Sequence, residues 1–249
     1  MRPFNEEKKL GEDFASRTEL LLGKDGVDAL KNACVIVFGI GGVGGFTAEA
    51  LARAGVGNIV LVDNDTVCES NRNRQIIATC DTVGRYKTEV MKERILSINP
   101  NCRVVEKALF FGQETFNEFD WENYDYVADA IDCVTSKILL AKTAEEKNIP
   151  IISSMGTGNK LDPTQFKVSD INKTTNCPLA RVMRTELRKR GIKKLKTVWS
   201  PEEPVIKGTK VPGSVSFVPS VAGLIMAGEI IKDIVSNAAQ NSRKEASDV

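Results

Sequence analysis

The chain has 249 residues, of which 42% are hydrophobic and 27% charged, a composition typical of a globular protein with a full core. At roughly 100–200 residues per domain, this length allows one large domain or two small ones. The 34 Lys and Arg residues against 33 Asp and Glu leave a formal charge of +1, so any nucleic-acid contact requires a local basic patch.

Histidine is absent from the sequence, which excludes a catalytic triad, a histidine base and most zinc hydrolase sites. The six cysteines form no C-x-x-C pair, which argues against a structural zinc site and against a disulfide framework. The N-terminal segment MRPFNEEKKLGEDF contains acidic residues and no apolar run, so we expect no signal peptide and a cytoplasmic protein.

One uncharged stretch has the length of a membrane span. Val211 to Gly228 covers 18 residues, the minimum for crossing a bilayer. It contains two prolines, three serines and three glycines, which favour a buried strand and helix over a span. We therefore expect no stable membrane insertion.

Strand and helix patterns alternate along the first 158 residues. The apolar runs are continuous, as expected of parallel strands that are buried on both faces. In chain order the sequence predicts a helix at Val27–Lys31, a strand at Ala33–Phe38, a glycine turn at Gly39–Gly45, a helix at Phe46–Ala54, a strand at Asn58–Asp63, a helix at Lys87–Ser97, strands at Cys102–Lys107 and Asp125–Ala130, a helix at Ser136–Lys147 and a strand at Pro150–Ser154. Repeated strand–helix–strand units of this kind build a parallel sheet.

The pattern weakens after residue 158. We expect an edge strand at Gln165–Asp170, a basic helix at Pro178–Arg190, a polar loop over 191–213, and two segments that close the core, Val215–Val218 and Ser220–Val235. The prediction is an α/β fold: an open, mostly parallel Rossmann-like sheet with a C-terminal crossover segment and a closing strand and helix. A single domain would span 1–249, with a nucleotide-binding core at about 33–158, a crossover and substrate or RNA region at 159–236, and a frayed tail at 237–249.

The glycine turn predicts a nucleotide site. Gly39-Ile-Gly41-Gly42-Val-Gly44 follows a predicted strand and opens a predicted helix, so backbone N–H groups can approach a phosphate at the helix N-terminus. Asp63 lies 19 residues after Gly44, at the end of the second strand, where a carboxylate accepts hydrogen bonds from ribose hydroxyls. The turn does not identify the nucleotide.

The residues after Asp63 indicate which kind of nucleotide the site binds. A nicotinamide enzyme needs one acidic residue here, whereas this chain has Asp63 and Asp65, then an Asn/Arg/Gln cluster that ends in Arg74-Gln75, then Lys87. An arginine and a lysine that converge on a phosphate site would offset the negative charge that develops on a bridging oxygen. The pattern therefore favours a triphosphate with pyrophosphate as the leaving group.

Four motifs in a fixed order carry a family resemblance. G-x-G-G-x-G, D-x-D-x-V, N-x-x-R-Q and G-x-x-K follow one another between Gly39 and Lys87. From about residue 14 to residue 236 the chain resembles the ubiquitin-activating-like (ThiF/MoeB/HesA-type) superfamily of adenylating enzymes. The resemblance implies an open α/β fold, generally a homodimer, in which a carboxylate attacks the α-phosphate of ATP.

Within the superfamily, the details resemble one branch. The run Asn71-Arg-Asn73-Arg74-Gln75 looks like the N-x-N-R-Q of the tRNA threonylcarbamoyladenosine dehydratases rather than the S-N-L-x-R-Q of the sulfur-carrier activators. The C-x-x-C pairs usual in the activators are absent. Further segments that look like the dehydratase branch are Arg17-Thr-Glu-Leu-Leu-Leu-Gly23, Asp162-Pro-Thr-Gln165, and Asp170 with Pro178-Leu-Ala180.

The resemblance also implies a role for each matching residue. Gly39, Gly41, Gly42 and Gly44 form the nucleotide turn. Asp63 holds the ribose, with Asp65 and Asn71 shaping the site. Arg74 and Lys87 bind the phosphates, with Gln75 in support, and Asp132 helps to hold Mg²⁺. Arg17 reaches the phosphates across a dimer interface; the alternative, a surface arginine before a helix, stays open. Carboxylates at the ends of parallel strands face the ligand crevice, and Mg²⁺ is usually held by one or two carboxylates plus phosphate oxygens. Strand alternation directs Asp129 elsewhere.

A basic segment predicts contact with RNA. Arg181 to Lys196 contains eight Lys or Arg residues and one acid, a local charge of 8 − 1 = +7. Helical spacing places Arg181, Arg184 and Arg188 on one face, and with Lys189 they are candidates to bind the phosphate backbone of tRNA. The alternative, a solvated helix whose charges pair with acids elsewhere, stays open.

Cys177 also has two alternative interpretations, a thiol that accepts an acyl group or a bystander. Many relatives pass an acyl group to a cysteine, and Arg181 and Arg184 follow Cys177 at helical spacing, where positive charge would activate a thiol. The resemblance to the dehydratase branch implies no evident need for a thioester, so a bystander cysteine is favoured, and the use of a thioester stays open. The sequence leaves open whether a monovalent cation or a sulfur-relay protein takes part.

The predicted function is ATP-dependent dehydration of threonylcarbamoyladenosine in tRNA through an acyl adenylate, with release of AMP and pyrophosphate. The closest alternative is an enzyme that adenylates the C-terminus of a ubiquitin-like sulfur-carrier protein. A nicotinamide dehydrogenase is less favoured because Arg74, Lys87 and Asp132 have no purpose there. A non-catalytic RNA- or partner-binding protein is the third alternative, and ATP turnover would exclude it.

Overall fold

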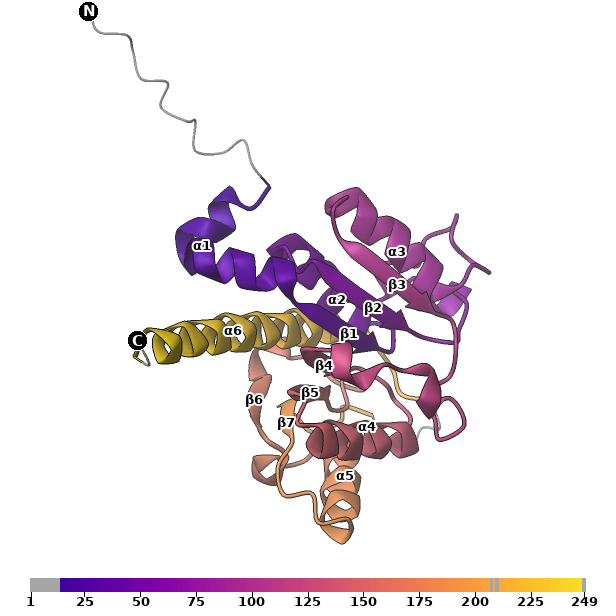
Figure 1. Cartoon of the computed structure of the whole chain (residues 1–249). Helices are drawn as coiled ribbons and strands as arrows, with labels where there is room; N and C mark the ends of the chain where they lie inside the picture. Colours follow the sequence, from indigo (N-terminus) through magenta and orange to yellow (C-terminus); the bar gives the residue numbers. More distant parts are fainter. Residues whose placement is uncertain (1–13, 207, 209–210, 248–249) are drawn as a thin grey trace, which may run out of the picture.

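A seven-stranded sheet forms the centre of the molecule, and the computed structural model describes residues 14–206, 208 and 211–247 (Figure 1). Its strand order is β3-β2-β1-β4-β5-β7-β6. All neighbouring strands are parallel except β6 and β7. The strands are β1 (Cys34–Phe38), β2 (Asn58–Val62), β3 (Arg103–Lys107), β4 (Tyr126–Asp129), β5 (Ile151–Ser154), β6 (Lys167–Asp170) and β7 (Lys196–Trp199). The predicted α/β class with an open, mostly parallel sheet is confirmed.

Helices cover both faces of this sheet. The α-helices are α1 (Ser16–Asn32), α2 (Gly44–Ala54), α3 (Lys87–Ile98), α4 (Val134–Lys147), α5 (Pro178–Lys189) and α6 (Phe217–Ser247). Short 3-10 turns are η1 (Glu69–Asn71), η2 (Phe116–Glu118), η3 (Trp121–Asn123), η4 (Pro163–Gln165) and η5 (Ile171–Lys173). Figure 1 shows α4 and α5 on the opposite side of the sheet from α1 and α2.

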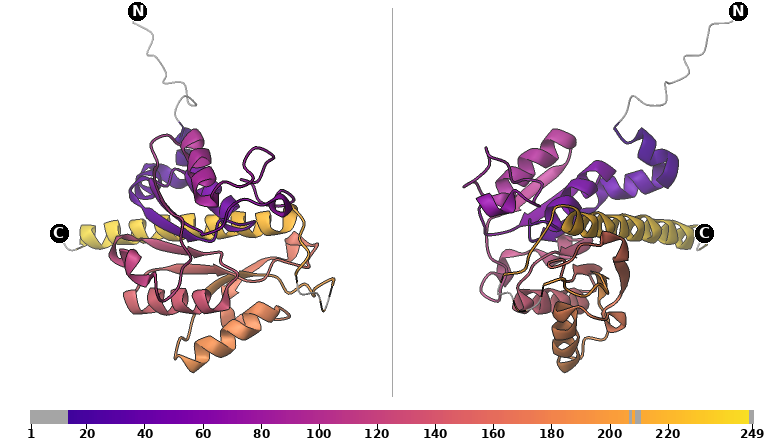
Figure 2. Two further views of the ribbon diagram at one scale, coloured as in Figure 1. Left: turned by 90° about the vertical axis from the view of Figure 1, so that its right-hand side faces the viewer. Right: turned by 180° about the vertical axis from the view of Figure 1, so that it is seen from behind.

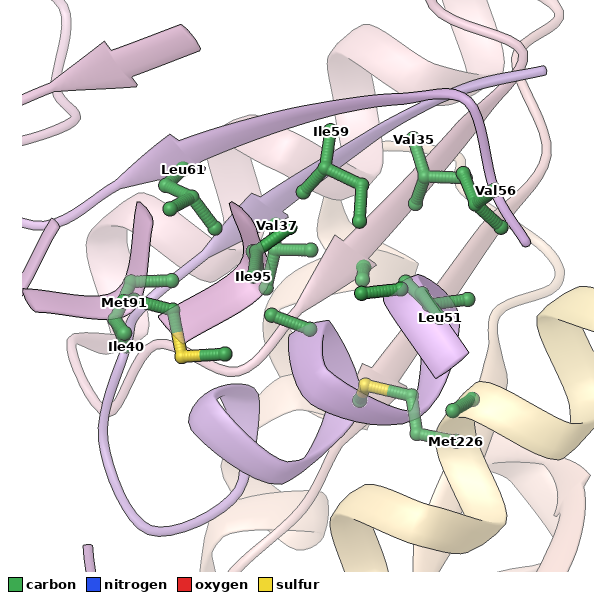
Figure 3. Close-up of a cluster of buried hydrophobic side chains, with 14 of the residues drawn as sticks. Val35, Val37, Ile40, Leu51, Val56, Ile59, Leu61, Met91, Ile95 and Met226 are labelled. Atoms are coloured by element: carbon green, nitrogen blue, oxygen red, sulfur yellow. The ribbon is translucent and has the colours of Figure 1, made fainter. Parts of the chain in front are cut away.

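Strand alternation divides the core into two layers. In β1, Val35 and Val37 pack with α2, α3 and α6, whereas Ile36 and Phe38 pack with aromatic residues of the opposite face. Figure 3 shows the first layer, in which Leu51 of α2 and Met226 of α6 lie beneath the strands. Burial on both faces explains the continuous apolar runs in the sequence.

The order of the strands creates a switch point beside β1. The chain passes from β1 outward to β2 and β3, then returns to place β4 on the other side of β1. The connections that leave β1 and β4 therefore diverge, and a crevice opens at the carboxyl ends of these strands, where α/β proteins bind ligands. The glycine turn follows β1, and Asp132 follows β4.

Strand β7 lies within the segment that the sequence predicted to be a polar loop. Residues 191–213 include Lys196–Trp199, which pairs with β5 on one side and with β6 on the other. A lysine begins this strand because its ammonium lies 2.8 Å from carboxylate oxygens of both Glu229 and Asp233 on α6. The predicted strand at Gln165–Asp170 corresponds to β6, which lies at the edge of the sheet as expected.

The C-terminal part is one long helix. The predicted closing segments merge into α6, which begins at Phe217, and residues 211–216 contain no strand. Residues 237–247, predicted to fray, continue α6, since Ala, Gln, Arg, Lys and Glu are good helix formers. Both views in Figure 2 show its C-terminal end projecting beyond the sheet. Among the described residues, no helix is long and apolar enough to cross a membrane.

Helix α1 is longer than predicted. It extends from Ser16 to Asn32 rather than over Val27–Lys31 alone, with a kink at Gly23, whose φ of 72° is not helical. The half after the kink packs on α6, where Gly26 meets Val235. The half before it carries Leu20 and Leu21, which are both exposed.

Candidate active site

A cleft of about 950 Å³ opens at the carboxyl ends of the central strands. It gathers predicted site residues from four separate parts of the chain. Those that line it are Gly39, Gly41, Gly42, Asp63, Asp65, Asn71, Arg74, Gln75, Lys87 and Asp132. Gly44 and Arg17 do not line it.

The glycine turn is shaped by two close approaches of backbone. Gly39 has φ of 84°, and a Cβ there would stand 2.7 Å from the carbonyl oxygen of Ala130. A Cβ on Gly44 would stand 1.8 Å from the carbonyl oxygen of Gly39. Gly44 therefore allows α2 to begin directly beneath the turn. The N-terminus of α2 carries a partial positive charge, which suits a phosphate.

Asp63 ties the ends of β1 and β2 together. Its two carboxylate oxygens accept hydrogen bonds from the backbone N–H of Ile40 at 2.7 Å and of Asp65 at 2.9 Å. Burial raises the pKa of Asp63 above its usual range, and the Lys87 ammonium and both backbone donors oppose that rise. An acceptor held in this way has lone pairs left for the hydroxyls of a sugar.

Lys87 is held at the edge of the cleft by two carboxylates. Its Nζ lies 2.6 Å from Oδ2 of Asp65 and 3.7 Å from Oδ1 of Asp63. The lysine side chain is only 7% exposed, whereas that of Asp65 is 60% exposed. Lys87 is thus a fixed, partly desolvated cation that faces the site from the first turn of α3.

Arg74 and Gln75 complete the predicted phosphate region. The Nη1 of Arg74 donates to the carbonyl oxygen of Ser70 at 3.0 Å and to Oδ1 of Asn73 at 2.9 Å. Gln75 is buried, and its Oε1 has no hydrogen-bond partner among the described residues. Buried polar atoms are normally paired, so this orphaned amide at the cleft wall suits a site that a polar ligand completes. Asn71 shapes the loop by accepting from the N–H of Cys68.

Asp132 and Asp129 have different surroundings. Asp132 is exposed at the cleft and forms no ion pair with another described residue. Asp129 is fully buried on the α4 side of the sheet, 2.9 Å from the ammonium of Lys137, which is also fully buried. Asp129 does not line the cleft, as strand alternation predicted, but Lys137 was not identified from the sequence.

The donor set fits a magnesium ion that nucleotide phosphates complete. Within the described ranges, no group of three or more His, Cys, Asp or Glu side chains is arranged to hold a metal by itself. Mg²⁺ bound with a nucleotide needs only one or two carboxylates from the protein. Asp132 offers one such carboxylate, and Asp129 is committed to Lys137.

Three further segments line the cleft and were not identified from the sequence. The first begins at the end of β5 and spans 154–158. The second leads into α6 and includes Pro212, Gly213 and Ser214, with Pro219 in the first turn of α6; the third is 109–111, after β3. The run Gly156-Thr157-Gly158 directly after a predicted strand was an available signal for the first. The second had no comparable signal, because its position depends on where the chain returns after β7.

The remaining predicted residues lie outside the cleft. Arg17 is exposed on α1. On α5, Arg181, Arg188 and Lys189 are exposed, but Arg184 is half-buried and its guanidinium donates to the carbonyl and hydroxyl oxygens of Thr174. Arg184 therefore differs from its neighbours on the predicted RNA-binding face.

Cys177 is buried, with 3% of its surface exposed, at the N-terminus of α5. A reactive thiol needs exposure, so this burial favours a packing role. We expect Cys177→Ala to retain ATP-dependent activity within about twofold. Activity is measured as AMP release by the purified variant. A loss beyond tenfold in a variant with a normal melting temperature would instead indicate acyl transfer to this thiol.

Comparisons with known proteins identify the relatives of this chain. The chain is similar to tRNA threonylcarbamoyladenosine dehydratase of Bacillus subtilis (strain 168), with 47% identity over 240 residues that cover 89% of this chain and 94% of the relative. It is also similar to crystal structures of E. coli tRNA N6-threonylcarbamoyladenosine dehydratase, TcdA. Both the AMP complex and the ATP complex match with a TM-score of 0.86 at 38% identity. The match to the AMP complex covers 90% of this chain and 94% of the E. coli chain, and the match to the ATP complex covers 91% and 95%. A model of the ThiF family matches residues 15–247, and with these relatives it shows that the chain belongs to the ThiF family.

Proposed function

We propose that this chain is an ATP-dependent dehydratase that cyclises threonylcarbamoyladenosine in tRNA. The observation that carries the proposal is the cleft at the switch point, which gathers the glycine turn, Asp63, Arg74, Lys87 and Asp132. The proposal is supported by the match to the B. subtilis dehydratase along 94% of that relative's length.

In the first step, the threonyl carboxylate attacks the α-phosphate of ATP. An acyl adenylate forms, and pyrophosphate leaves. The glycine turn and the N-terminus of α2 would bind the phosphates, and Arg74 and Lys87 would stabilise the negative charge that develops on the leaving oxygen. Bound Mg²⁺, held in part by Asp132, would supply further neutralisation of the phosphate charges.

In the second step, the neighbouring carbamoyl group attacks the activated carbonyl carbon. The bond to AMP breaks, a ring closes, and one proton is released, so the modified nucleoside loses one water overall. AMP is a good leaving group, and the two reacting groups belong to one side chain. Positioning and charge stabilisation therefore suffice, which suits a protein without histidine.

The proposal includes a homodimer and a cytoplasmic location. Arg17 lies away from the cleft of its own chain, on the first half of α1 beside the exposed Leu20 and Leu21. We assign Arg17 to the phosphates of a second copy, as the family resemblance implies. An enzyme acting on tRNA is expected in the cytoplasm.

The basic helix α5 is the proposed tRNA surface. Its first turn reaches the cleft through Leu179, so RNA whose modified nucleoside occupies the cleft would continue along this helix. Lys189 pairs with Glu186 on the same helix. Arg181 and Arg188 are exposed and form no ion pair with any described residue, which makes them the stronger candidates for phosphate contacts.

Replacing both Arg181 and Arg188 with alanine is expected to weaken tRNA binding and to reduce its salt slope by about one per lost phosphate contact. Affinity for ATP should not change, because neither residue lines the cleft. The measurement is tRNA affinity at several salt concentrations. Arg184→Ala is the comparison, expected to cost stability rather than RNA affinity, and unchanged tRNA affinity in the double variant would remove α5 from the interface.

The function is tested by incubating the protein with ATP, Mg²⁺ and bulk tRNA, with and without K⁺. The digested nucleosides are then weighed, and AMP is assayed. Loss of one water with stoichiometric AMP is expected. AMP formation only after a ubiquitin-like carrier protein is added would move the chain to the sulfur-carrier activators, and no AMP under either condition would overturn the enzymatic assignment.

A further inference from the structure

The side chain of Asn73 bridges two parts of the cleft that are far apart in the sequence. Its Nδ2 donates to the carbonyl oxygen of Ser214 at 3.0 Å and to the hydroxyl oxygen of Ser214 at 3.3 Å. Its Oδ1 accepts from the Nη1 of Arg74 at 2.9 Å. Both Arg74 and Ser214 line the cleft. One amide group therefore connects an arginine of the phosphate region with the opposite wall.

That wall is held at a second point by Asn159. The Oδ1 of Asn159 accepts from the N–H of Gly213 at 2.6 Å, and its own N–H donates to the carbonyl oxygen of Gly213 at 2.8 Å. Asn73 and Asn159 thus bind consecutive residues, Ser214 and Gly213, from two different sides. Loss of either contact would release one side of the wall.

The acceptors around Arg74 are both neutral. Among the residues that the structure describes, its Nη1 donates to the Asn73 amide oxygen and to the backbone carbonyl oxygen of Ser70. Lys87, by contrast, pairs with the carboxylate of Asp65 at 2.6 Å. Neutral acceptors fix the direction of a guanidinium without offsetting its charge, and that charge stays available to phosphate.

We propose that Asn73 is a positioning residue that orients Arg74 toward the phosphates and holds the Gly213–Ser214 wall against it. This inference rests on the proposed adenylation, because that proposal assigns Arg74 to the phosphates.

Two substitutions separate this role from a merely structural one. Asn73→Ala removes both contacts and adds no charge, so ATP affinity should change less than about threefold, while AMP formation should slow by about tenfold to a hundredfold because Arg74 is no longer aligned. Asn73→Asp keeps the acceptor, loses the donor and places a negative charge beside Arg74, so ATP affinity should fall by about tenfold. Asn101→Ala, another exposed asparagine outside the cleft, is the matched control.

The experiment measures ATP binding by calorimetry, AMP formation under saturating ATP, and hydrogen–deuterium exchange of residues 211–217 in the full chain. Both Asn73 variants should exchange faster than wild type over 211–217 and melt within a few degrees of it. Wild-type exchange and wild-type AMP formation in Asn73→Ala would overturn the proposal, as would unchanged ATP affinity in Asn73→Asp. ATP binding and exchange require no RNA, so they test Asn73 even if tRNA proves not to be the substrate.

Discussion

Replacing Lys87 with alanine is expected to slow AMP formation by about 10²–10³-fold, the usual cost of removing one preorganised group that stabilises transition-state charge. The lysine is 7% exposed and fixed between Asp65 and Asp63, so no other side chain takes its position. Without Lys87, the phosphates of ATP would face the carboxylates of Asp63 and Asp65, and the site would have one positive charge fewer to stabilise them. The measurement is the rate of AMP release with saturating tRNA, together with ATP affinity by calorimetry.

Lys92→Ala is the matched control for this variant. Lys92 lies on the same helix, α3, and pairs with Glu106 at 3.0 Å, but its side chain is 36% exposed and lies outside the cleft. Exposed pairs of this kind contribute about 0–1 kcal/mol, so the control should keep wild-type activity. A Lys87→Ala variant that folds normally and keeps AMP formation within tenfold of wild type would contradict the assigned role.

The second large effect is expected at the buried ion pair between Asp129 and Lys137, next to the segment that contains Asp132. Replacing Lys137 with methionine should lower the free energy of unfolding by about 3–5 kcal/mol, because it leaves the carboxylate of Asp129 buried without a counter-charge. The Lys137 ammonium also donates to the carbonyl oxygen of Ile131 at 3.0 Å, and Asp129 accepts from the N–H of Ile131 at 3.2 Å. The pair therefore holds the peptide that precedes Asp132.

Thermal denaturation measures this prediction. At about 2–4 °C per kcal/mol for a chain of this size, the melting temperature should fall by about 6–20 °C. Lys142→Met, on the same helix but exposed and 3.6 Å from Glu146, should change it little. The double variant Asp129→Leu with Lys137→Met should be more stable than Lys137→Met alone, because no unpaired charge remains. Equal stability of Lys137→Met and wild type would show that the pair contributes nothing.

The nucleotide half of the cleft could be predicted because its signals are local. The glycine turn, Asp63 and Lys87 each follow or begin an element that hydrophobic periodicity identifies, and the end of a parallel strand places a side chain at the crevice. The strands with continuous apolar runs were located within one or two residues for the same reason.

The remaining features depend on contacts between distant segments. Lys137 has the sequence surroundings of any lysine on an amphipathic helix, and only Asp129 on the neighbouring strand explains its burial. Strand β7 was not predicted because Lys196 lies in a basic run and its partners on α6 are distant in the sequence. Arg184 shares its helical spacing with Arg181 and Arg188, yet its guanidinium donates a hydrogen bond to Thr174. No pattern within one element reports such pairings.

The late position of α6 has a consequence for a chain that is still on the ribosome. Ala222, Met226 and Ile230 of α6 belong to the same core layer as Val35 and Val37 of β1, and Pro219 lines the cleft at the start of the helix. Synthesis proceeds from the N-terminus, so β1, β2 and β4 emerge long before the helix that covers them. A nascent chain therefore exposes this apolar layer to chaperones and has an incomplete cleft. The cleft is therefore complete only after the start of α6 has been synthesised.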